Sequence, residues 1–569
     1  MAQARVKDKL ERDVLMEANI KIRVNRTDYL EKSGITLLNL VQKHQINHTS
    51  PILAAKVNNE LRPLTDILTQ NCEIEFIDRS YDDGLRIYVR SLTMMFIRAC
   101  KELFPRCEVS VEHSLNKGLY CEIKDETSLS PSQVNRIETR MREIVASREL
   151  FERIEVDVED AQSIMKSMGF GDKAELLKYR AEKTIPLYRF GWVTDCLYGY
   201  MVPDSGYLDI FELKFYLPGL ILRYPTKQTP NKLPDFEDNP KLYSVFRESE
   251  NWAHRVNVAN VLQLNNKIET GGGQELIHIS EALHEKQIAE IADKISLRRQ
   301  QIHLILIAGP SASGKTTFAQ RLKIHLMVNG LHPIPISMDN YYLDRDSIPI
   351  EEDGQRDLES ISTIDIELLN EHLSRLIQGQ QVEIPYFNFK KGMREYRGNI
   401  ISINDQQPLI IEGIHGLNEQ LTPMIPKMNK FKIYISALTQ LNLDSHNRIP
   451  TTDTRLIRRI VRDKQFRGAS IDDTLTMWSS VRRGEEKYIF PFQEMADVMF
   501  NSALTYEMAV LKPYIMPLLI NINTNDIHFT EANRLKKFMK YFVELDGVNI
   551  PATSIIKEFT GGSCFHYGH

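Results

Sequence analysis

One short motif limits the folds open to this chain more than any other feature. Residues 309–316 read GPSASGKT, which fits the pattern GxxxxGK[ST]. The apolar run LILIA before it predicts a buried strand, and TTFAQRLKIHL after it predicts a helix. In such a strand–loop–helix unit, backbone N–H groups and the helix N-terminus point at an anion. The motif therefore predicts a phosphate-binding loop and leaves open whether a kinase, a GTPase or an ATPase carries it.

We expect the loop to bind the phosphates of a nucleotide. Lys315 is expected to reach the outer phosphates, and the Thr316 hydroxyl is expected to coordinate Mg²⁺. The complete set of expected phosphate-binding residues is Gly309, Ser311, Ala312, Ser313, Gly314, Lys315, Thr316 and Thr317.

The whole chain sets broader limits. Its 569 residues allow about three or four domains at ~150 residues each. An apolar content of 42% permits a large core, and a net charge of −5 gives no overall basic footprint for nucleic acid. The six cysteines are scattered without a CxxC, which favours reduced thiols in a cytoplasmic protein. Neither a signal peptide nor an apolar run of ~18 residues is recognisable, so no membrane association is expected.

Strand and helix patterns divide the chain into segments. From about residue 300 to 525 they alternate, which predicts a parallel sheet covered by helices on both faces. The Pro-rich stretch 223–240 predicts a linker, so the chain without residues 1–225 is expected to remain folded. The predicted segments are a tail (1–18), a β-rich unit (19–80), an α+β unit (84–225), a linker with a leading helix (226–295), the phosphate-loop domain (296–545) and a second tail (546–569).

Two acidic residues follow apolar strands beyond the loop. Asp339 comes directly after PIPIS, where a carboxylate can accept a proton from an attacking hydroxyl. Glu412 ends PLIIE, a position at which an acid orders Mg²⁺ directly or through water. Asp339 is also expected to lie close enough to assist the metal. A turn aspartate or helix cap is the structural alternative for Asp339.

A row of arginines follows in TDTRLIRRIVRDKQFRG. Arg455, Arg458, Arg459 and Arg462 recur at i, i+3, i+4 and i+7, which places them along one helix face. Guanidinium groups suit the charge that spreads over a transferring phosphoryl group. The alternative is a solvated basic face or an RNA contact.

These motifs together resemble the uridine kinase branch of the uridine kinase/phosphoribulokinase family. GPSASGKTTFA, SMDNYY, IIEGIHGL and TDTRLIRRIVRDKQFRG match it in order and spacing, as does PFQEMADVMFNSAL near the end. The resemblance implies transfer of a phosphoryl group from ATP, with Mg²⁺, to the 5′-hydroxyl of a nucleoside in pyrimidine salvage. It implies Asp339 as the base, with Thr316 and Glu412 at the metal. Arg459, Arg462 and Arg467 would belong to a mobile lid that closes on the phosphates and excludes water.

The acceptor side departs from the family pattern. The ribose-contacting acid falls at Glu359, with Asp357 two residues earlier, and the base-reading segment reads PYFNFKKGMR. Phe387 replaces a tyrosine, and Gly392 stands at a histidine position, so hydrogen bonds to a pyrimidine edge are lost. The expected substrate-binding residues are Asp357, Glu359, Tyr386, Phe387, Phe389 and Arg394.

The front half resembles two domains of threonyl-tRNA synthetases. ILAAKVNNELRPLTDILTQNCEIEFID is similar to the β-grasp TGS domain, and GLRIYVRSLTMMFIRACKELFP, NKGLYCEI and LYRFGWVTDCLYGYMVPDSGY are similar to the editing-type second domain. The HxxxH and CxxxH pairs of that domain's editing site fall here on Arg90 and Met94 and on Cys196 and Tyr200. Three of four ligands are absent, so no zinc is expected, and Cys196 is expected to be a core thiol.

The sequence thus predicts an α/β phosphate-loop kinase domain behind a β-grasp unit and an α+β synthetase-like unit. The leading hypothesis is a cytoplasmic ATP- and Mg²⁺-dependent nucleoside kinase with a regulatory front half that binds RNA or a protein partner. A second hypothesis keeps the reaction but changes the acceptor to another sugar or polyol. A third, non-enzymatic hypothesis is a nucleotide-sensing module that binds RNA or a partner. Homo-oligomers are implied by the family resemblance alone.

Overall fold

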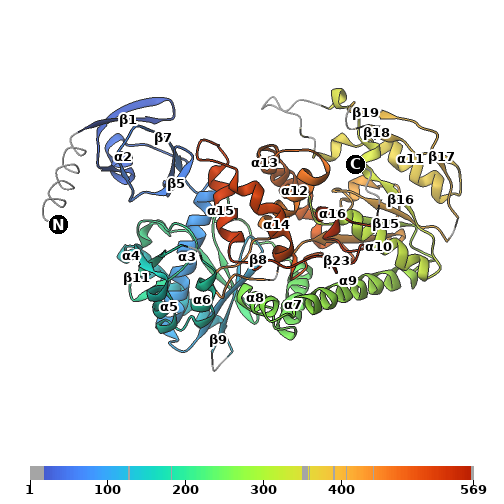
Figure 1. The fold of residues 1–569 in the computed structure, drawn as a ribbon. Coiled ribbons are helices and arrows are strands. Elements are labelled where there is room, and N and C mark those ends of the chain that lie inside the picture. Colours follow the sequence, from blue (N-terminus) through green and yellow to red (C-terminus); the bar gives the residue numbers. More distant parts are fainter. Residues whose placement is uncertain are drawn as a thin grey trace.

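The computed structural model describes residues 18–125, 128–180, 182–348, 357, 359–388, 391–404, 406–439 and 441–565. Figure 1 shows a small β-rich unit at the N-terminal end, an α+β unit beside it, and a larger C-terminal half on the other side of the molecule. Among the described helices, none combines the length and the apolar character needed to cross a bilayer.

The first unit is a five-stranded mixed sheet with one helix on it. Its strand order is β2-β1-β7-β4-β5, and β1 runs parallel to β7. Burial alternates along β1, where Ile20, Ile22 and Val24 are buried while their neighbours are exposed. The elements are β1 (Asn19–Val24), β2 (Thr27–Lys32), β3 (Ile35–Thr36), α2 (Leu37–His44), β4 (Ala54–Val57), β5 (Glu60–Pro63), β6 (Ile67–Leu68) and β7 (Cys72–Ile77).

The second unit packs helices on two antiparallel sheets, ordered β13-β14-β9-β8 and β10-β11-β12. Ser130 caps the helix α4: its hydroxyl accepts from the Gln133 backbone N–H, and the Gln133 side chain accepts from the Ser130 N–H. The elements are α3 (Asp82–Leu103), β8 (Glu108–Leu115), β9 (Gly118–Lys124), α4 (Pro131–Ser147), β10 (Glu152–Asp157), α5 (Val158–Ser167), α6 (Gly171–Leu176), β11 (Thr184–Phe190), β12 (Val193–Asp195), β13 (Glu212–Tyr216) and β14 (Gly219–Arg223).

The segment expected to be a linker with one leading helix contains three helices. They are α7 (Pro240–Arg255), α8 (Val261–Glu269) and α9 (Gly273–Ser296). Leu242 and Phe246 of α7 pack with Leu115 and Ile221 of the second unit and with Leu438 of the C-terminal half. The two halves therefore share buried apolar surface, and removal of residues 1–225 would expose the part of it on α7 and Leu438 to water.

The C-terminal half is built on the parallel sheet that the alternating pattern predicts. Its order is β16-β21-β15-β22-β23, with the phosphate-loop strand β15 at the centre. All five residues of β15 are buried, because helices cover both faces of the sheet. The strands are β15 (Leu304–Ala308), β16 (Ile334–Ser337), β21 (Leu409–Glu412), β22 (Lys430–Ser436) and β23 (Val498–Asn501).

Helices and short hairpins complete this half. The hairpins are β17 (Val382–Glu383) with β20 (Ile400–Ile401), and β18 (Tyr386–Asn388) with β19 (Met393–Glu395). The helices are α10 (Lys315–Val328), α11 (Ile366–Ile377), α12 (Thr451–Phe466), α13 (Ile471–Tyr488), α14 (Glu507–Ile520), α15 (Phe529–Met539) and α16 (Lys557–Thr560).

The segment after residue 545, expected to be a tail, is part of the core as far as the structure describes it. Ile550, Ile555, Ile556 and Phe559 are buried in the cluster that also contains the core side chains of α10 and α12. Ile555 lies against the phosphate loop. The end of the chain thus supports the candidate site.

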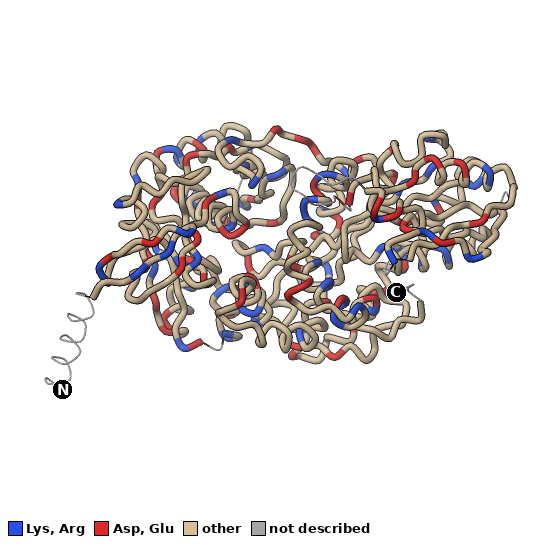
Figure 2. The backbone as a smooth tube through the Cα atoms, turned by 90° about the horizontal axis from the view of Figure 1, so that it is seen from above, with Lys and Arg blue, Asp and Glu red and all other residues tan. Residues whose placement is uncertain are grey.

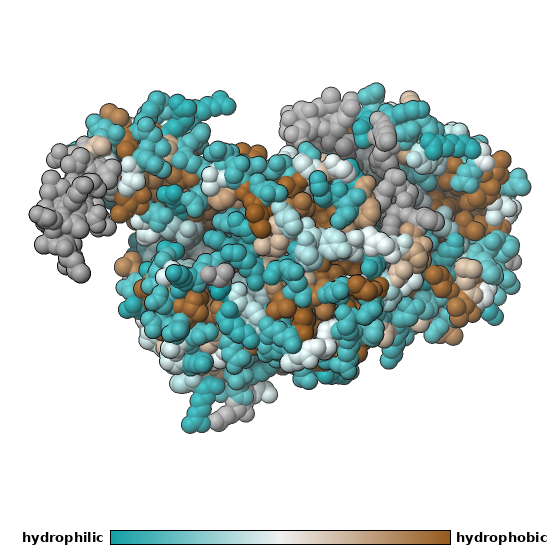
Figure 3. Space-filling model, viewed as in Figure 1, coloured by the Kyte–Doolittle hydropathy of each residue, from teal (hydrophilic) through white to brown (hydrophobic). Residues whose placement is uncertain are grey.

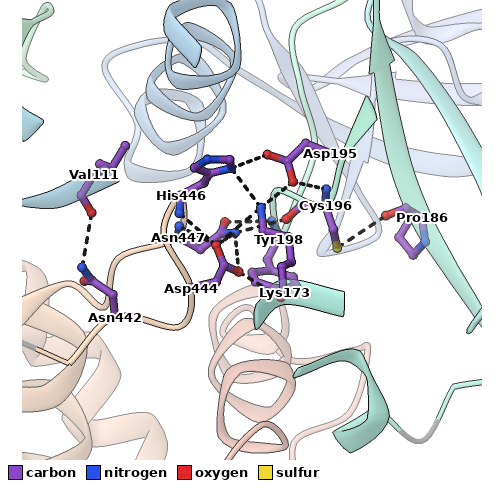
Figure 4. A network of polar contacts seen from close by, with 10 residues as sticks. All are labelled: Val111, Lys173, Pro186, Asp195, Cys196, Tyr198, Asn442, Asp444, His446 and Asn447. Carbon is purple, nitrogen blue, oxygen red and sulfur yellow. Dashed lines mark hydrogen bonds and ion pairs between the residues drawn. The ribbon is translucent and has the colours of Figure 1, made fainter. Parts of the chain in front are cut away.

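A buried network of charges joins the two halves (Figure 4). The loop between β22 and α12 enters the second unit, where Asp444 and His446 meet Lys173 and Asp195. Lys173 forms an ion pair with Asp195 and lies 3.4 Å from the Asp444 carboxylate, and the His446 ring lies 2.7 Å from Asp195. Asn442 in the same loop donates to the backbone oxygen of Val111 at 3.3 Å. The front half therefore holds the chain segment that leads into α12.

Charges of both signs are interspersed along the backbone (Figure 2), in keeping with the small net charge. On the face seen in Figure 3, hydrophilic residues surround separate groups of hydrophobic ones.

Candidate functional site

The candidate site lies at one edge of the parallel sheet. Strand β21 pairs with β15 and with β16, so that Glu412 lies beside both Ile307 and Ser337. Asp339 follows Ser337 by two residues, and the phosphate loop follows β15. Because carboxyl ends of parallel strands meet at one edge, all three elements converge where the sequence predicted.

The backbone of the phosphate loop is tightly packed. A Cβ added to Gly309 would lie 2.0 Å from the backbone oxygen of Ile435, and one added to Gly314 would lie 2.5 Å from Ile555. Gly314 has a φ of +83° and Ala312 has a φ of +57°, both in the left-handed region. The Ser313 hydroxyl is buried and has no hydrogen-bond partner among the described residues. An anion with several acceptor oxygens would satisfy that hydroxyl.

Lys315 and Thr316 follow as the first residues of α10. The Lys315 ammonium donates to the backbone oxygens of Gly309 at 2.9 Å and Pro310 at 3.1 Å, and burial lowers its pKa. The Thr316 hydroxyl donates to Glu412 at 3.1 Å. Burial raises the pKa of Glu412 to about 7. This arrangement gives a cation and a hydroxyl–carboxylate pair beside the loop.

The next residue, Thr317, contacts the C-terminal segment. Thr317 was expected to contact phosphate, and its hydroxyl instead donates to the buried carboxylate of Glu558 at 2.6 Å. Its backbone N–H also approaches Glu558, at 3.3 Å. Thr317 thus ties α10 to the C-terminal segment.

Asp339 is partly buried close to these groups. Burial raises the pKa of its carboxyl, while the charges of Lys315 and Arg467 oppose that rise. Its backbone N–H is bound by the Ser337 hydroxyl at 3.3 Å. A carboxylate whose basicity is increased by burial, beside cations, is suited to accept a proton.

The predicted arginine row is confirmed as helical, and all four members are buried on α12. Two of them hold the phosphate loop in place. Arg455 donates to the Ser311 backbone oxygen at 2.9 Å and pairs with Glu485. Arg458 donates to the Ala312 backbone oxygen at 3.4 Å and pairs with Glu507.

The other arginines are less firmly held. Arg459 donates to the Ser311 hydroxyl at 2.9 Å. Arg459, Arg462 and Arg467 all lie within 3.0–3.6 Å of the single carboxylate of Asp463. One acid for three cations leaves excess positive charge next to the loop, which favours a bound anion.

Two of the expected acceptor residues, Asp357 and Glu359, lie against α13. Asp357 accepts from the Tyr488 hydroxyl at 2.5 Å, and Lys487 lies 3.3 Å away. Glu359 packs against Gly484, and burial raises its pKa although Arg459 and Lys315 oppose the rise. The charges of Arg459 and Lys315 beside the phosphate loop therefore act on the Glu359 carboxyl.

The hairpin β18–β19 carries the remaining expected acceptor residues. Phe387 is buried, and its ring centre lies 5.6 Å from that of Tyr342. Tyr386 is 41% exposed, with the Arg397 guanidinium over its ring. Arg394 is paired with Asp365 at 2.9 Å and donates to the Tyr342 backbone oxygen at 3.2 Å, so it fixes the hairpin. Phe389 lies outside the described residues.

Gly392 has a backbone that disfavours the family's histidine. Its φ is +70°, and a Cβ there would lie 2.8 Å from the Arg345 side chain. A histidine at this position would be strained in the present hairpin.

Sequence reasoning missed four residues around the site. Glu485, Glu507 and Glu558 are the buried carboxylates that bind Arg455, Arg458 and Thr317. No local pattern distinguished them, because each acts through a residue at least 30 positions away. His415 lies within the quoted IIEGIHGL segment, is 1% exposed, and has no hydrogen-bond partner for either ring nitrogen among the described side chains. Burial lowers the pKa of His415 to about 4, so the ring is neutral at pH 7.

Of the four editing-site positions of the front half, Arg90, Cys196 and Tyr200 line one cavity. The Arg90 guanidinium donates to the backbone oxygen of Tyr200 at 2.7 Å, and Met94 is fully buried. Cys196 is buried as predicted, and burial raises its thiol pKa to about 12. Among the described residues, no group of three His, Cys, Asp or Glu side chains converges as a metal site.

The chain is similar to two different kinds of known protein. Residues 304–509 match the Phosphoribulokinase / Uridine kinase family. The chain is 27% identical over 194 residues to a uridine kinase of Halobacterium salinarum, covering 34% of this chain and 77% of that protein. It is also 27% identical over 181 residues to a threonine--tRNA ligase of Pelobacter propionicus, covering 32% of this chain and 28% of the ligase.

Solved structures give weaker likenesses. One is described as a possible uridine kinase from Bacillus stearothermophilus, with 20% identity, a TM-score of 0.23, and coverage of 35% of this chain and 88% of that chain. The chain thus contains a domain similar to the kinase family, while it spans only 28% of the length of the tRNA ligase that it matches.

Proposed function

We propose that the C-terminal half is an ATP- and Mg²⁺-dependent kinase that transfers a phosphoryl group to an alcohol. One observation carries the proposal: the phosphate loop, the Thr316–Glu412 pair and Asp339 meet at one edge of the sheet. A nucleotide sensor needs the loop, but it has no use for a basic carboxylate such as Asp339 beside it.

The residues fit ATP and magnesium. The unpartnered Ser313 hydroxyl and the Lys315 ammonium would bind phosphate oxygens, and Thr316 and Glu412 would hold Mg²⁺. Two protein ligands suffice, because Mg²⁺ at such sites is completed by substrate phosphates and water. When bound, the metal neutralises charge on the phosphates of ATP.

The reaction follows from the side chains. Asp339 accepts the proton of the acceptor hydroxyl while the oxygen of that hydroxyl bonds to the terminal phosphorus of ATP. The bond between that phosphorus and the ADP oxygen breaks, and ADP leaves. The cations Lys315, Arg459, Arg462 and Arg467 stabilise the charge that spreads over the transferring group. The Asp463 carboxylate pairs with these three arginines, and a bound phosphate group would compete with it for them.

For the acceptor, we propose the 5′-hydroxyl of a nucleoside such as uridine or cytidine. The similarity of residues 304–509 to the family supports this choice. Asp357 and Glu359 would bind the ribose, and Phe387 and Tyr386 would lie near the base. The buried, unpartnered ring of His415 is positioned on the same side and would supply a neutral hydrogen-bonding group.

A second candidate acceptor is a sugar or polyol. It is favoured by one observation: Phe387 packs against Tyr342, and Gly392 presents no side chain, so the hairpin offers little to read a base edge. We further propose that the TGS-like and editing-like units regulate the kinase in the cytoplasm by binding RNA or a protein, and that the chain forms homo-oligomers.

The test is turnover of the full chain with Mg²⁺ and ATP. Asp339→Asn should reduce kcat by at least ~10²-fold while ATP still binds, because the base is lost and the loop remains. Lys315→Ala should lose ~10²-fold or more through weaker stabilisation of the transferring phosphoryl group. Lys323→Ala, on the same helix α10 but outside the loop, is the matched control. Equal turnover of Asp339→Asn and the control would refute the assignment of the base.

A further inference from the structure

A cavity of about 500 Å³ lies where the three parts of the chain meet. Its walls come from β5 of the first unit, α3 and the segment 196–200 of the second unit, and the 443–453 loop and α15 of the C-terminal half. Figure 1 shows α15 next to the first two units, away from the parallel sheet. The volume falls within the ~300–1,000 Å³ typical of small-molecule sites.

The cavity is lined by an excess of positive charge. Seven Arg and Lys residues face four Asp and Glu residues. Each of these four acids already has a cation of its own: Glu60 with Arg62, Asp82 with Lys227, Asp83 with Arg86, and Asp453 with Arg534. Four of the seven cations are paired as well, Arg86 with Asp83, Arg153 with Glu155, Arg180 with Glu182 and Arg534 with Asp453. Arg90, Arg448 and Lys537 remain without an ion pair among the described residues.

Arg90 and Arg448 are the clearest examples. Arg90 makes one hydrogen bond, to the backbone oxygen of Tyr200, and its guanidinium lies against Gly199, where a Cβ would come within 2.5 Å. Arg448 makes no side-chain hydrogen bond or ion pair among the described residues, although it is half-buried. Burial lowers the pKa of both groups, that of Arg90 to about 10. Two half-buried guanidinium groups without an acid favour an anionic ligand.

The rest of the lining is largely aromatic. Rings from the second unit and from α15 and the residues just after it contribute flat apolar surface that can stack on a planar ligand. The rings are Tyr198, Tyr200, Tyr224, Phe529, Phe538 and Tyr541.

The cavity also touches the start of α12. Pro450, Thr452 and Asp453 line it, and the helix dipole places partial positive charge at this first turn. Arg459, seven residues on from Thr452 and so about 10 Å along the axis, contacts the phosphate loop. A ligand at the cavity would therefore act on the same rigid helix that holds the loop.

We propose that this cavity is a second ligand site, which binds a small phosphate-bearing compound with a planar ring, of nucleotide size. Arg90 and Arg448 bind the phosphate, and the tyrosine and phenylalanine rings hold the planar part. Binding at the first turn of α12 couples the site to the phosphate loop. This inference is independent of the kinase reaction, since it concerns binding alone.

The test is calorimetric titration of the full chain with UMP, AMP and inorganic pyrophosphate as separate probes. At least one mononucleotide should bind on the order of tenfold more weakly to Arg90→Met and to Arg448→Met, because each loses a charge-assisted hydrogen bond. Arg189→Met, an exposed arginine of the second unit outside the cavity, should bind within twofold of the wild type. Lys315→Ala should retain this binding, because the phosphate loop is elsewhere. If a methionine variant unfolds, Arg90→Lys and Arg448→Lys should fold and weaken binding about threefold, since lysine keeps the charge but not the fork of donors.

Hydrogen exchange locates the bound probe. The proposal expects protection of residues 82–93 and 448–456 when the mononucleotide binds. Protection confined to residues 309–316, or equal affinities in the Arg90, Arg448 and Arg189 variants, would overturn it. Binding of pyrophosphate alone, or of an RNA oligonucleotide but no mononucleotide, would overturn the assignment of the ligand class.

Discussion

Replacing Lys173 by methionine tests whether the buried charge network between the two halves stabilises the folded chain. Lys173 is 2% exposed and pairs with Asp195, which is fully buried, and with Asp444 at 3.4 Å. Without the ammonium, two buried carboxylates would be left facing each other. Loss of one partner of a buried ion pair costs about 3–5 kcal/mol. Since every ~1.4 kcal/mol is tenfold, the unfolding equilibrium should shift roughly a thousandfold.

The assay is urea unfolding of the full chain, followed by intrinsic fluorescence and far-UV circular dichroism. Lys178→Met is the control, because Lys178 is 45% exposed and lies 3.7 Å from a similarly exposed Glu269, a pair worth ~0–1 kcal/mol at most. Adding Asp195→Asn and Asp444→Asn to Lys173→Met should recover part of the loss, because the uncompensated charges are removed. A Lys173→Met variant as stable as the control would refute the reasoning.

Further predictions concern single residues. Burial opposes ionisation of Asp195, but the charges of Lys173 and His446 outweigh it and keep its pKa well below its usual range. Ionised Asp195 stabilises the folded state fully above its unfolded-state pKa of about 4, and this stabilisation is lost as pH falls further. Asp195→Asn should therefore flatten the dependence of the free energy of unfolding on pH below pH 5. The same slope in the variant as in the wild type would contradict this. Gly309→Ala should abolish ATP binding in a filter assay, because its Cβ would meet a backbone oxygen at 2.0 Å; binding within threefold of wild type would contradict it. Arg458→Met should lower the free energy of unfolding by about 3–5 kcal/mol, seen as a lower urea midpoint, because it leaves the buried carboxylate of Glu507 unpaired. Loss of turnover in a variant as stable as the wild type would instead assign Arg458 to catalysis. His415→Phe should raise the KM for the acceptor with the KM for ATP unchanged, and the reverse pattern would exclude it from the acceptor site.

The parts of the site that the sequence predicts are those encoded locally. The phosphate loop needs a strand, a fixed spacing of residues and a helix, all within residues 304–328. Asp339 and Glu412 are found in the same way, because each directly follows or ends a short apolar strand. Their convergence then follows from the geometry of parallel strands.

Long-range pairing explains what the sequence does not reveal. Helical spacing places Arg455 and Arg458 on one face, but their acids lie 30 and 49 positions further along the chain, so no pattern separates them from Arg459 and Arg462. For the same reason the role of residues 550–559 in the core is not visible in a short segment without clear periodicity. The segment 223–240 is rich in proline, yet the helix after it packs on both halves through Leu242 and Phe246. Composition predicts a lack of regular structure, and it does not predict which surfaces meet.

The most direct test of the central claim is consumption of ATP by the purified full chain with Mg²⁺, measured against a panel of nucleosides, sugars and polyols. The account predicts turnover with uridine or cytidine, loss of that turnover in Asp339→Asn, and ATP binding retained in the variant. Turnover with a sugar or polyol alone would keep the reaction and reassign the acceptor side of the site. Absence of turnover with every alcohol, in a protein that binds ATP, would contradict the account.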